Sequence, residues 1–318
     1  MHPSPLVSIC IPTFNYGRFL PEVIRSVLSQ SLSDFELIVV DNASTDATVE
    51  LMETFVRSDP RISFYRNAEN VGIVQNFNRA LGYAAADYVK ILCADDLLAP
   101  SALERSLALI QSNPAVSLVT TGRLLVNYRL RPVGYISYCS KQGSVDGTKV
   151  IDRCLFGTNY VGEPSAVMFR RQQAAAGFDE NYPHLLDMAM WFHLLEQGRL
   201  ACIPEPLTYI RQHKNQITQD NRRTGQLMED KKRIFSAYIA KPYVRKTALR
   251  VFLWQLRTAY NAWKGAAGDT PGQRISGFLP PVWFYALLPA VVAADLLERA
   301  VSRVRSIKYV CQALGGNR

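Results

Sequence analysis

Short apolar runs alternate with helix-like segments through the first 120 residues, and this alternation constrains the fold more than any other feature. The run at residues 35–40 is almost wholly apolar, which suits a parallel strand buried on both faces. We expect strands at residues 6–11, 35–40, 62–65, 88–92 and 116–121, and helices at residues 19–30, 44–57, 73–86 and 100–111. Repeated strand–helix units predict an α/β fold in which helices cover a parallel sheet.

The net positive charge of the chain comes entirely from its last quarter. The chain has 36 Lys and Arg against 27 Asp and Glu, and residues 241–318 hold 12 of the basic and 3 of the acidic residues. The first 240 residues are therefore neutral, which argues against a nucleic-acid-binding protein. With 48% apolar and 20% charged residues, the composition excludes a mostly disordered chain and a polytopic membrane protein.

Six cysteines are spread along the chain without a CxxC pair or a metal-like cluster: Cys10, Cys93, Cys139, Cys154, Cys202 and Cys311. Most have apolar neighbours and are expected to be small buried hydrophobic residues, which favours a reducing compartment. The N-terminus lacks the pattern of a signal peptide. We therefore expect the chain in the cytosol or on the cytosolic face of a membrane.

Polar residues follow each of the first four predicted strands. Ligands of α/β sheets bind beyond the C-terminal ends of the strands, so these residues are the candidates for a site. They are Pro12, Thr13 and Asn15 after the first strand, Asp41 and Asp46 after the second, Asn70 and Gly72 after the third, and Asp95 and Asp96 after the fourth. Neither GxGxxG nor GxxxxGK[ST] is present, so no dinucleotide fold or P-loop is indicated.

The acidic residues at these strand ends have competing interpretations. Asp46 fits a helix cap. Asp41 closes an apolar run and could accept hydrogen bonds from a base or ribose. Asp95 and Asp96 repel each other unless a cation or donor neutralises them, and their hard oxygens suit Mg²⁺ or Mn²⁺ together with phosphate. The alternative for this pair is a helix-capping role before Pro100.

Four motifs in this order resemble those of the family 2 glycosyltransferases: VSICIPTFN (residues 7–15), VVDNASTD (39–46), NVG (70–72) and LCADDL (92–97). These are inverting enzymes of the GT-A fold that use nucleotide sugars, and the resemblance covers about residues 5–215. It implies a nucleotide-sugar site that includes Pro12, Thr13, Asn15, Asp41, Asn70, Gly72 and Asp95. It also implies a metal site in which Asp96 is the direct ligand, although Cys93 stands where many members have an acidic residue.

The same resemblance assigns roles in the second half. Glu163 would contact an acceptor hydroxyl, or would simply pair with a nearby arginine. Asp187 would be the general base, although Leu186 replaces the first acid of the usual pair; a helix N-cap is the alternative. Arg211 would pair with phosphate oxygens and His213 would bind the metal or diphosphate, unless His213 is a surface residue.

The basic C-terminal segment has two interpretations. Its Lys and Arg residues could form a solvated helix face, or the segment could be a peripheral membrane anchor. Residues 278–297 are apolar but contain Pro280, Pro281, Pro289 and Asp295, which favours a surface or re-entrant segment over a straight span. Tryptophans and nearby arginines support docking on an anionic leaflet: Trp254, Trp263, Trp283, Arg299, Arg303 and Arg305.

We therefore expect a GT-A domain at 1–240, with a nucleotide-sugar half at about 1–121 and an acceptor half at about 122–240, and a helical membrane-associated tail at 241–318. The expected activity is metal-dependent, inverting transfer from a nucleotide sugar, most plausibly UDP-linked, to a glycan or lipid-linked acceptor in bacterial surface polysaccharide synthesis. The expected location is the inner face of the plasma membrane. A sugar-phosphate nucleotidyltransferase and a catalytically inactive nucleotide- or glycan-binding module are the alternatives.

Overall fold

The computed structural model describes residues 5–213, 226–265, 287 and 289–293. Two compact units divide the chain: residues 1–150 with 160–212, and residues 151–159 with 213–318. The division falls after Gln212, whereas the charge pattern placed a boundary at residue 240. All the sequence-predicted site residues except His213 belong to the first unit.

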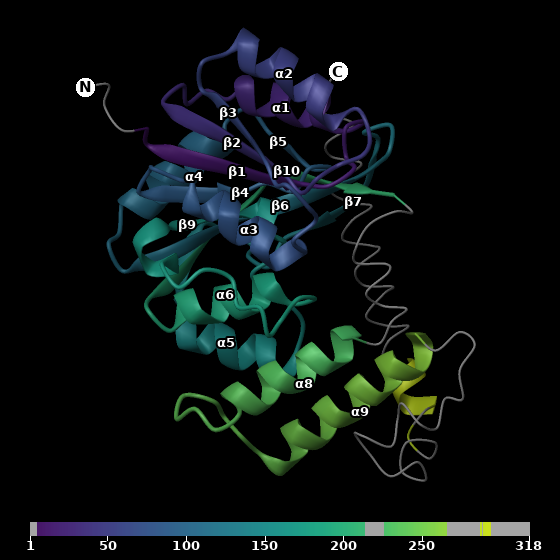
Figure 1. The fold of residues 1–318 in the computed structure, drawn as a ribbon. Coiled ribbons are helices and arrows are strands. Elements are labelled where there is room, and N and C mark those ends of the chain that lie inside the picture. The colour runs from purple at the N-terminus through teal and green to yellow at the C-terminus, as the bar shows by residue number, and fades with distance from the viewer. Residues whose placement is uncertain (1–4, 214–225, 266–286, 288, 294–318) are drawn as a thin grey trace, which may run out of the picture. The chain divides into compact units, whose positions relative to one another are not determined.

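The first unit is built on a mixed ten-stranded sheet with the order β3-β2-β1-β4-β9-β6-β10-β5, with β7 paired to β6 and β8 to β10 (Figure 1). The strands are β1 (Val7–Thr13), β2 (Phe35–Asp41), β3 (Ile62–Arg66), β4 (Tyr88–Ile91), β5 (Leu97–Leu98), β6 (Val116–Asn127), β7 (Pro132–Ile136), β8 (Gly143–Asp146), β9 (Val167–Arg170) and β10 (Arg199–Gln212). All five predicted strands are present, as β1, β2, β3, β4 and β6.

Helices pack on both faces of this sheet. They are α1 (Leu20–Leu28), α2 (Thr48–Ser58), α3 (Ile73–Gly82), α4 (Ala102–Gln111) and α6 (Leu186–Leu195), with short 3₁₀ turns at Pro164–Ala166 and Arg171–Ala174. The helix α5 (Gly147–Phe156) begins in this unit and continues into the second. Apolar residues of α1, α2 and α4 join one buried core with Ile9 of β1 and Leu37 of β2. The helix α3 lies on the opposite face, where the Cys10 thiol donates to the Ala80 carbonyl.

The expectation of a parallel sheet holds only for part of the molecule. β1 pairs in parallel with β2 and β4, and β6 pairs in parallel with β10. The short strand β9 lies antiparallel between β4 and β6 and joins these two parallel groups. Its four residues sit between two 3₁₀ turns, too short a run for an apolar pattern to reveal.

The sequence suggested that the first strand ends before Pro12, but the strand is longer. β1 continues through Pro12, which lies opposite Val40, to Thr13. Its pairing with β4 stops at Cys10, so one side of β1 has no strand partner from there on. A proline lacks only the N–H donor, and a strand tolerates this where no ladder partner needs it.

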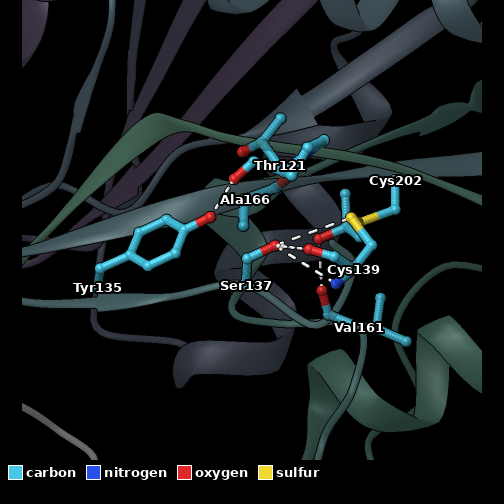
Figure 2. The surroundings of a disulfide bond; sticks show 9 residues. Thr121, Tyr135, Ser137, Cys139, Val161, Ala166 and Cys202 are labelled. Carbon is cyan, nitrogen blue, oxygen red and sulfur yellow. Dashed lines mark hydrogen bonds between the residues drawn. A yellow bond between two sulfur atoms is a disulfide. The ribbon is translucent and has the colours of Figure 1, made fainter. Parts of the chain in front are cut away.

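The cysteines are not all unpaired. Cys139 and Cys202 form a disulfide, with Cα atoms 6.4 Å apart (Figure 2). Cys10, Cys93 and Cys154 are not disulfide-bonded; Cys10 and Cys154 are buried, as expected, and Cys93 is half-buried. The pairing was missed because 63 residues separate the two positions. Cys311 lies outside the described residues.

The second unit contains the helices α8 (Gln226–Tyr238) and α9 (Ala248–Gly265). Phe235 stacks on Trp254 with ring centroids 3.6 Å apart. Arg250 pairs with Asp152 at 2.9 Å, so this basic side chain is part of the packed unit. No helix in the described ranges is both long enough and apolar enough to cross a membrane. Arg299, Arg303 and Arg305 lie outside those ranges.

Candidate active site

The loops after β1 and β2 are bound to each other at the sheet edge. Thr13 lies opposite Asp41 in the register, and the Asn42 amide donates to the Thr13 carbonyl at 2.9 Å. The Asn15 amide donates to Ser44 Oγ at 2.7 Å, and the Asn15 side-chain oxygen accepts from the Thr45 amide at 2.8 Å. The strand order therefore brings Pro12, Thr13, Asn15 and Asp41 together, as the sequence predicted.

The two acidic residues of the second loop, Asp41 and Asp46, have different hydrogen-bond partners. Asp41 is fully buried, accepts hydrogen bonds from the Ser44 amide and lies 3.4 Å from Nε of Arg66. Asp46 instead accepts from the Thr48 amide at 3.1 Å and the Gly17 amide at 2.9 Å. Asp46 thus joins the start of α2 to the loop after β1, but it lies one residue before the N-cap, Ala47, so the interpretation as a helix cap is not confirmed.

A network of asparagines holds the third loop. Asn42 donates from Nδ2 to the Asn70 side-chain oxygen at 2.8 Å, and that oxygen also accepts from the Gly72 amide at 3.0 Å. Gly72 has φ +85°, a left-handed conformation that suits glycine, immediately before α3 begins. Asn70 and Gly72 thus lie beside the second loop, and both are exposed.

The acidic pair after β4 is buried and does not cap a helix. α4 begins several residues later, at Ala102, and the two-residue strand β5 intervenes. The Asp96 carboxylate accepts from Ser165 Oγ at 2.6 Å and from the Arg211 amide at 3.0 Å. Burial, and next the charge of Asp95, raise the pKa of Asp96 well above its ordinary value, against the Ser165 hydrogen bond that lowers it. This pair is an acidic cluster that a cation would neutralise.

The buried side chain of Arg211 is hydrogen-bonded to this acidic loop. Its side chain is 1% exposed, and Nε donates to the Asp95 carbonyl at 2.9 Å. Its terminal nitrogen contacts Glu22 of α1 at 2.6 Å, and the other donates to the Tyr128 carbonyl at 3.3 Å. The guanidinium predicted to meet phosphate oxygens is thus engaged by protein oxygens.

A buried lysine lies in the strand that precedes the acidic pair. Lys90 is fully buried in β4, and its Nζ has no hydrogen-bond partner in the part of the chain that the structure describes. Burial lowers the pKa of Lys90 to about 7, and the negative charge of Asp96 opposes that shift. The signal for Lys90 was present in the sequence, as a charged residue inside an apolar strand.

Asp187 lies in the first turn of α6, but it is not the N-cap, which is Leu185. Its carboxylate accepts from the neighbouring Met188 amide at 2.8 Å. Burial raises the pKa of Asp187 to about 6, and the charge of Glu163 adds to the rise. A carboxyl group with this pKa is a suitable proton acceptor near neutral pH. The interpretation as a simple N-cap is wrong.

Electrostatic interactions place Asp187 with the acidic pair. Burial raises the pKa of the Cys93 thiol well above its ordinary value, and the charges of Asp96, Asp95 and Asp187 raise it further. The Cys93 amide donates to Ser165 Oγ at 3.0 Å, and this same hydroxyl donates to Asp96. Ser165, which the sequence did not single out, thus links the two halves of the site.

Glu163 pairs with an arginine, as one interpretation held. Arg123 contacts it at 2.9 Å, and the arginine is 2% exposed whereas the Glu163 side chain is 46% exposed. Gly162 beside it has φ +116°, and a Cβ there would lie 2.3 Å from the Arg123 guanidinium. Glu163 is therefore fixed by a buried cation and keeps part of its carboxylate accessible.

The donor atoms fit a hard divalent cation that also takes ligands from its substrate. In the described ranges, no three His, Cys, Asp or Glu side chains gather into a ready-made metal cluster. Asp96 and its neighbour Asp95 offer carboxylate oxygens. Mg²⁺ typically binds through one or two carboxylates plus phosphates. His213 follows β10 directly and belongs to the second compact unit.

Comparisons with known proteins agree with this geometry. The family model described as glycosyl transferase family 2 matches residues 8–176. A putative teichuronic acid biosynthesis glycosyltransferase, TuaG from Bacillus subtilis (strain 168), is 29% identical over 200 residues, which are 62% of this chain and 75% of that protein.

Two solved structures share the fold. S. aureus TarS (residues 1–349, in complex with UDP-GlcNAc) has a TM-score of 0.57 at 16% identity and covers 96% of this chain and 91% of its own. The mannosyltransferase PcManGT from Pyrobaculum calidifontis, in complex with GDP-Man and Mn²⁺, has a TM-score of 0.55 at 18% identity over 93% of this chain and 88% of its own. With the family model matching more than half of the sequence, this chain belongs to glycosyltransferase family 2.

Proposed function

We propose that this protein is an inverting glycosyltransferase that moves a sugar from a UDP-sugar to a glycan or lipid-linked acceptor in surface polysaccharide synthesis. The observation that carries the proposal is the buried Asp95–Asp96 pair at the end of β4, where Ser165 bonds both Asp96 and Cys93, together with the charge of Asp187 acting on the same Cys93. One proton acceptor and one cation-binding acidic pair are the two functions that a single displacement at the anomeric carbon requires. TuaG, named for teichuronic acid biosynthesis, supports the polysaccharide context.

The mechanism follows from the states of these carboxylates. Asp187, with a pKa of about 6, is mostly deprotonated at neutral pH and accepts the proton of the acceptor hydroxyl as the new bond forms. Asp96 and Asp95 would hold Mg²⁺ or Mn²⁺, which would stabilise the charge on the departing nucleoside diphosphate. No second carboxylate of a hydrolase pair is required.

The donor side is assigned to the loops after β1, β2 and β3. Asp41 and Arg66 place an acceptor and a donor of hydrogen bonds 3.4 Å apart, suited to the uracil or ribose of the nucleotide. Thr13 and Asn15 lie on the adjoining loop, and Pro12, Asn70 and Gly72 shape its surroundings. S. aureus TarS, which shares the fold, was solved with UDP-GlcNAc.

The test is turnover of a panel of UDP- and GDP-sugars in Mn²⁺, Mg²⁺ or EDTA. We expect hydrolysis or transfer of one donor with either metal and none in EDTA. Asp96→Ala should abolish turnover and weaken UDP binding, whereas the exposed Glu50→Gln on α2 serves as the matched control. Full activity of Asp96→Ala, or of the wild type in EDTA, would refute the metal-dependent mechanism. Sugar-phosphate nucleotidyl transfer, or donor binding without turnover, would support one of the two alternatives.

We also propose that residues 241–318 dock the enzyme on the inner face of the plasma membrane. This segment carries the whole net charge of +9, and each Lys or Arg near an anionic surface contributes about 1 kcal/mol. Vesicles with and without phosphatidylglycerol should separate wild type from the triple variant Arg299→Glu, Arg303→Glu, Arg305→Glu in co-sedimentation. If the folded variant binds the anionic vesicles as well as the wild type does, these three charges do not contribute to docking. If the wild type does not bind vesicles at all, a soluble acceptor becomes the better hypothesis.

A further inference from the structure

The segment after β7 is fastened to the central sheet next to the proposed acceptor side. Cys139 is joined by its disulfide to Cys202 of β10 (Figure 2). Cys202 also pairs with Gly143 at the start of β8. Ser137 Oγ donates to the Cys139 carbonyl at 2.9 Å and closes a tight turn. Tyr138 stands between these two residues, so its position is set on both sides.

Tyr138 takes part in an arrangement of aromatic and charged groups around one buried arginine. The Arg123 guanidinium carbon lies 4.7 Å from the centroid of the Tyr138 ring, and the Tyr160 ring meets Tyr138 edge-on at 5.1 Å. The same guanidinium pairs with Glu163 at 2.9 Å. Tyr138 is 36% exposed, so this ring is oriented by Arg123 and still reaches the surface.

This arrangement is connected to the proposed base. The Trp191 indole, on α6 one turn after Asp187, donates to the Gly162 carbonyl at 3.0 Å, and Gly162 precedes Glu163. The charge of Glu163 in turn raises the pKa of Asp187. Tyr138 is therefore linked, through Arg123 and Glu163, to the region where the acceptor hydroxyl would lose its proton.

We infer that Tyr138 is a platform for a sugar ring of the acceptor, an inference that rests on the proposed function. A sugar ring has a face of C–H groups and a rim of hydroxyl groups. The π face of an aromatic ring is electron-rich and attracts polarised C–H groups, while a carboxylate accepts hydroxyl hydrogen bonds. Tyr138 and Glu163 supply these two surfaces around a common arginine, so the acceptor unit beside Asp187 is a glycan ring.

The test separates acceptor binding from donor chemistry. The probes are p-nitrophenyl glycosides of glucose, galactose, mannose and N-acetylglucosamine, used as acceptors with the nucleotide sugar that the wild type turns over. Tyr138→Ala should raise the KM for the glycoside at least tenfold and leave hydrolysis of the nucleotide sugar within twofold. Tyr138→Phe should behave as the wild type, because the ring and not the hydroxyl forms the platform.

The matched control is Tyr83→Ala, which removes another exposed aromatic ring, stacked on Tyr65. An unchanged glycoside KM in Tyr138→Ala would overturn the inference. Transfer by the wild type in the same assay would still support the proposed function. An equal loss of hydrolysis and transfer would show a merely structural role and would also overturn it. If no nucleotide sugar is turned over, the proposed function fails, and saturation-transfer NMR with the same glycosides decides the inference: loss of the signal in Tyr138→Ala supports it, and no signal with wild type refutes it.

Discussion

The guanidinium of Arg211 contacts the Glu22 carboxylate at 2.6 Å, across 189 residues of sequence. Because Arg211 also donates to the Asp95 carbonyl, this ion pair joins α1 to the acidic loop. Arg211 is buried whereas Glu22 is 46% exposed, so this carboxylate is a direct counter-charge for the buried guanidinium. The relationship implies that Arg211 positions the acidic loop that is proposed to bind the metal.

Replacing Glu22 with Gln distinguishes two roles for Arg211. If Arg211 positions the acidic loop, Glu22→Gln should loosen that loop and weaken UDP binding in Mn²⁺ by about tenfold, equivalent to about 1.4 kcal/mol. If Arg211 instead contacts phosphate directly, the same change releases its guanidinium, and UDP should bind more tightly. Calorimetric titration with UDP decides between the two signs, with Glu53→Gln on the exposed side of α2 as the control.

The pH profile of transfer should show Asp187. Its pKa of about 6 means that the base is protonated, and therefore inactive, below that pH. We expect kcat/KM to fall about tenfold per pH unit on the acid side of pH 6. Asp187→Asn should remove this limb and reduce transfer by a factor of about 10² or more, with UDP binding nearly intact.

Glu163→Gln provides the second arm of that experiment. The charge of Glu163 contributes to the raised pKa of Asp187, so the acid limb should move to lower pH in this variant. A limb that remains at pH 6 in Asp187→Asn would exclude Asp187 as the base. Glu163 would then be the next candidate.

The site illustrates which features a sequence can reveal. The loops with Thr13, Asp41 and Asp96 were predictable because each follows an apolar run, and parallel strands end at a common edge. The partner of Arg211 was not, because Glu22 lies in a helix whose own pattern needs no such contact. The role of Ser165 also depends on tertiary structure, since its hydroxyl contacts Asp96 from 69 residues away.

Lys90 should make the stability of the metal-free protein depend on pH. Its pKa is about 7 when folded and has the ordinary value of 10.5 when unfolded, so the unfolded chain binds more protons between these values. The free energy of unfolding therefore rises as the pH increases from about 7 to 10.5, and below pH 7 the burial of charged Lys90 destabilises the fold by a constant amount. Lys90→Met should be more stable than wild type at pH 6, with the difference shrinking toward pH 10. Urea unfolding at pH 6, 8 and 9.5 measures it, and a difference independent of pH would contradict the lowered pKa.

The disulfide between Cys139 and Cys202 should stabilise the fold and the acceptor platform together. It closes a loop with a sequence separation of 63, for which loop-closure entropy gives about 4 kcal/mol in the unfolded state. The double variant Cys139→Ser, Cys202→Ser should melt at a lower temperature than oxidised wild type and should no longer respond to dithiothreitol. Because Tyr138 adjoins Cys139, the variant should also raise the glycoside KM while sparing hydrolysis of the nucleotide sugar. Peptide mass mapping after alkylation without reductant tests the bond itself. Alkylated Cys139 and Cys202 in the wild type would show that the disulfide is not formed. The melting curve of the wild type should then match that of the double variant.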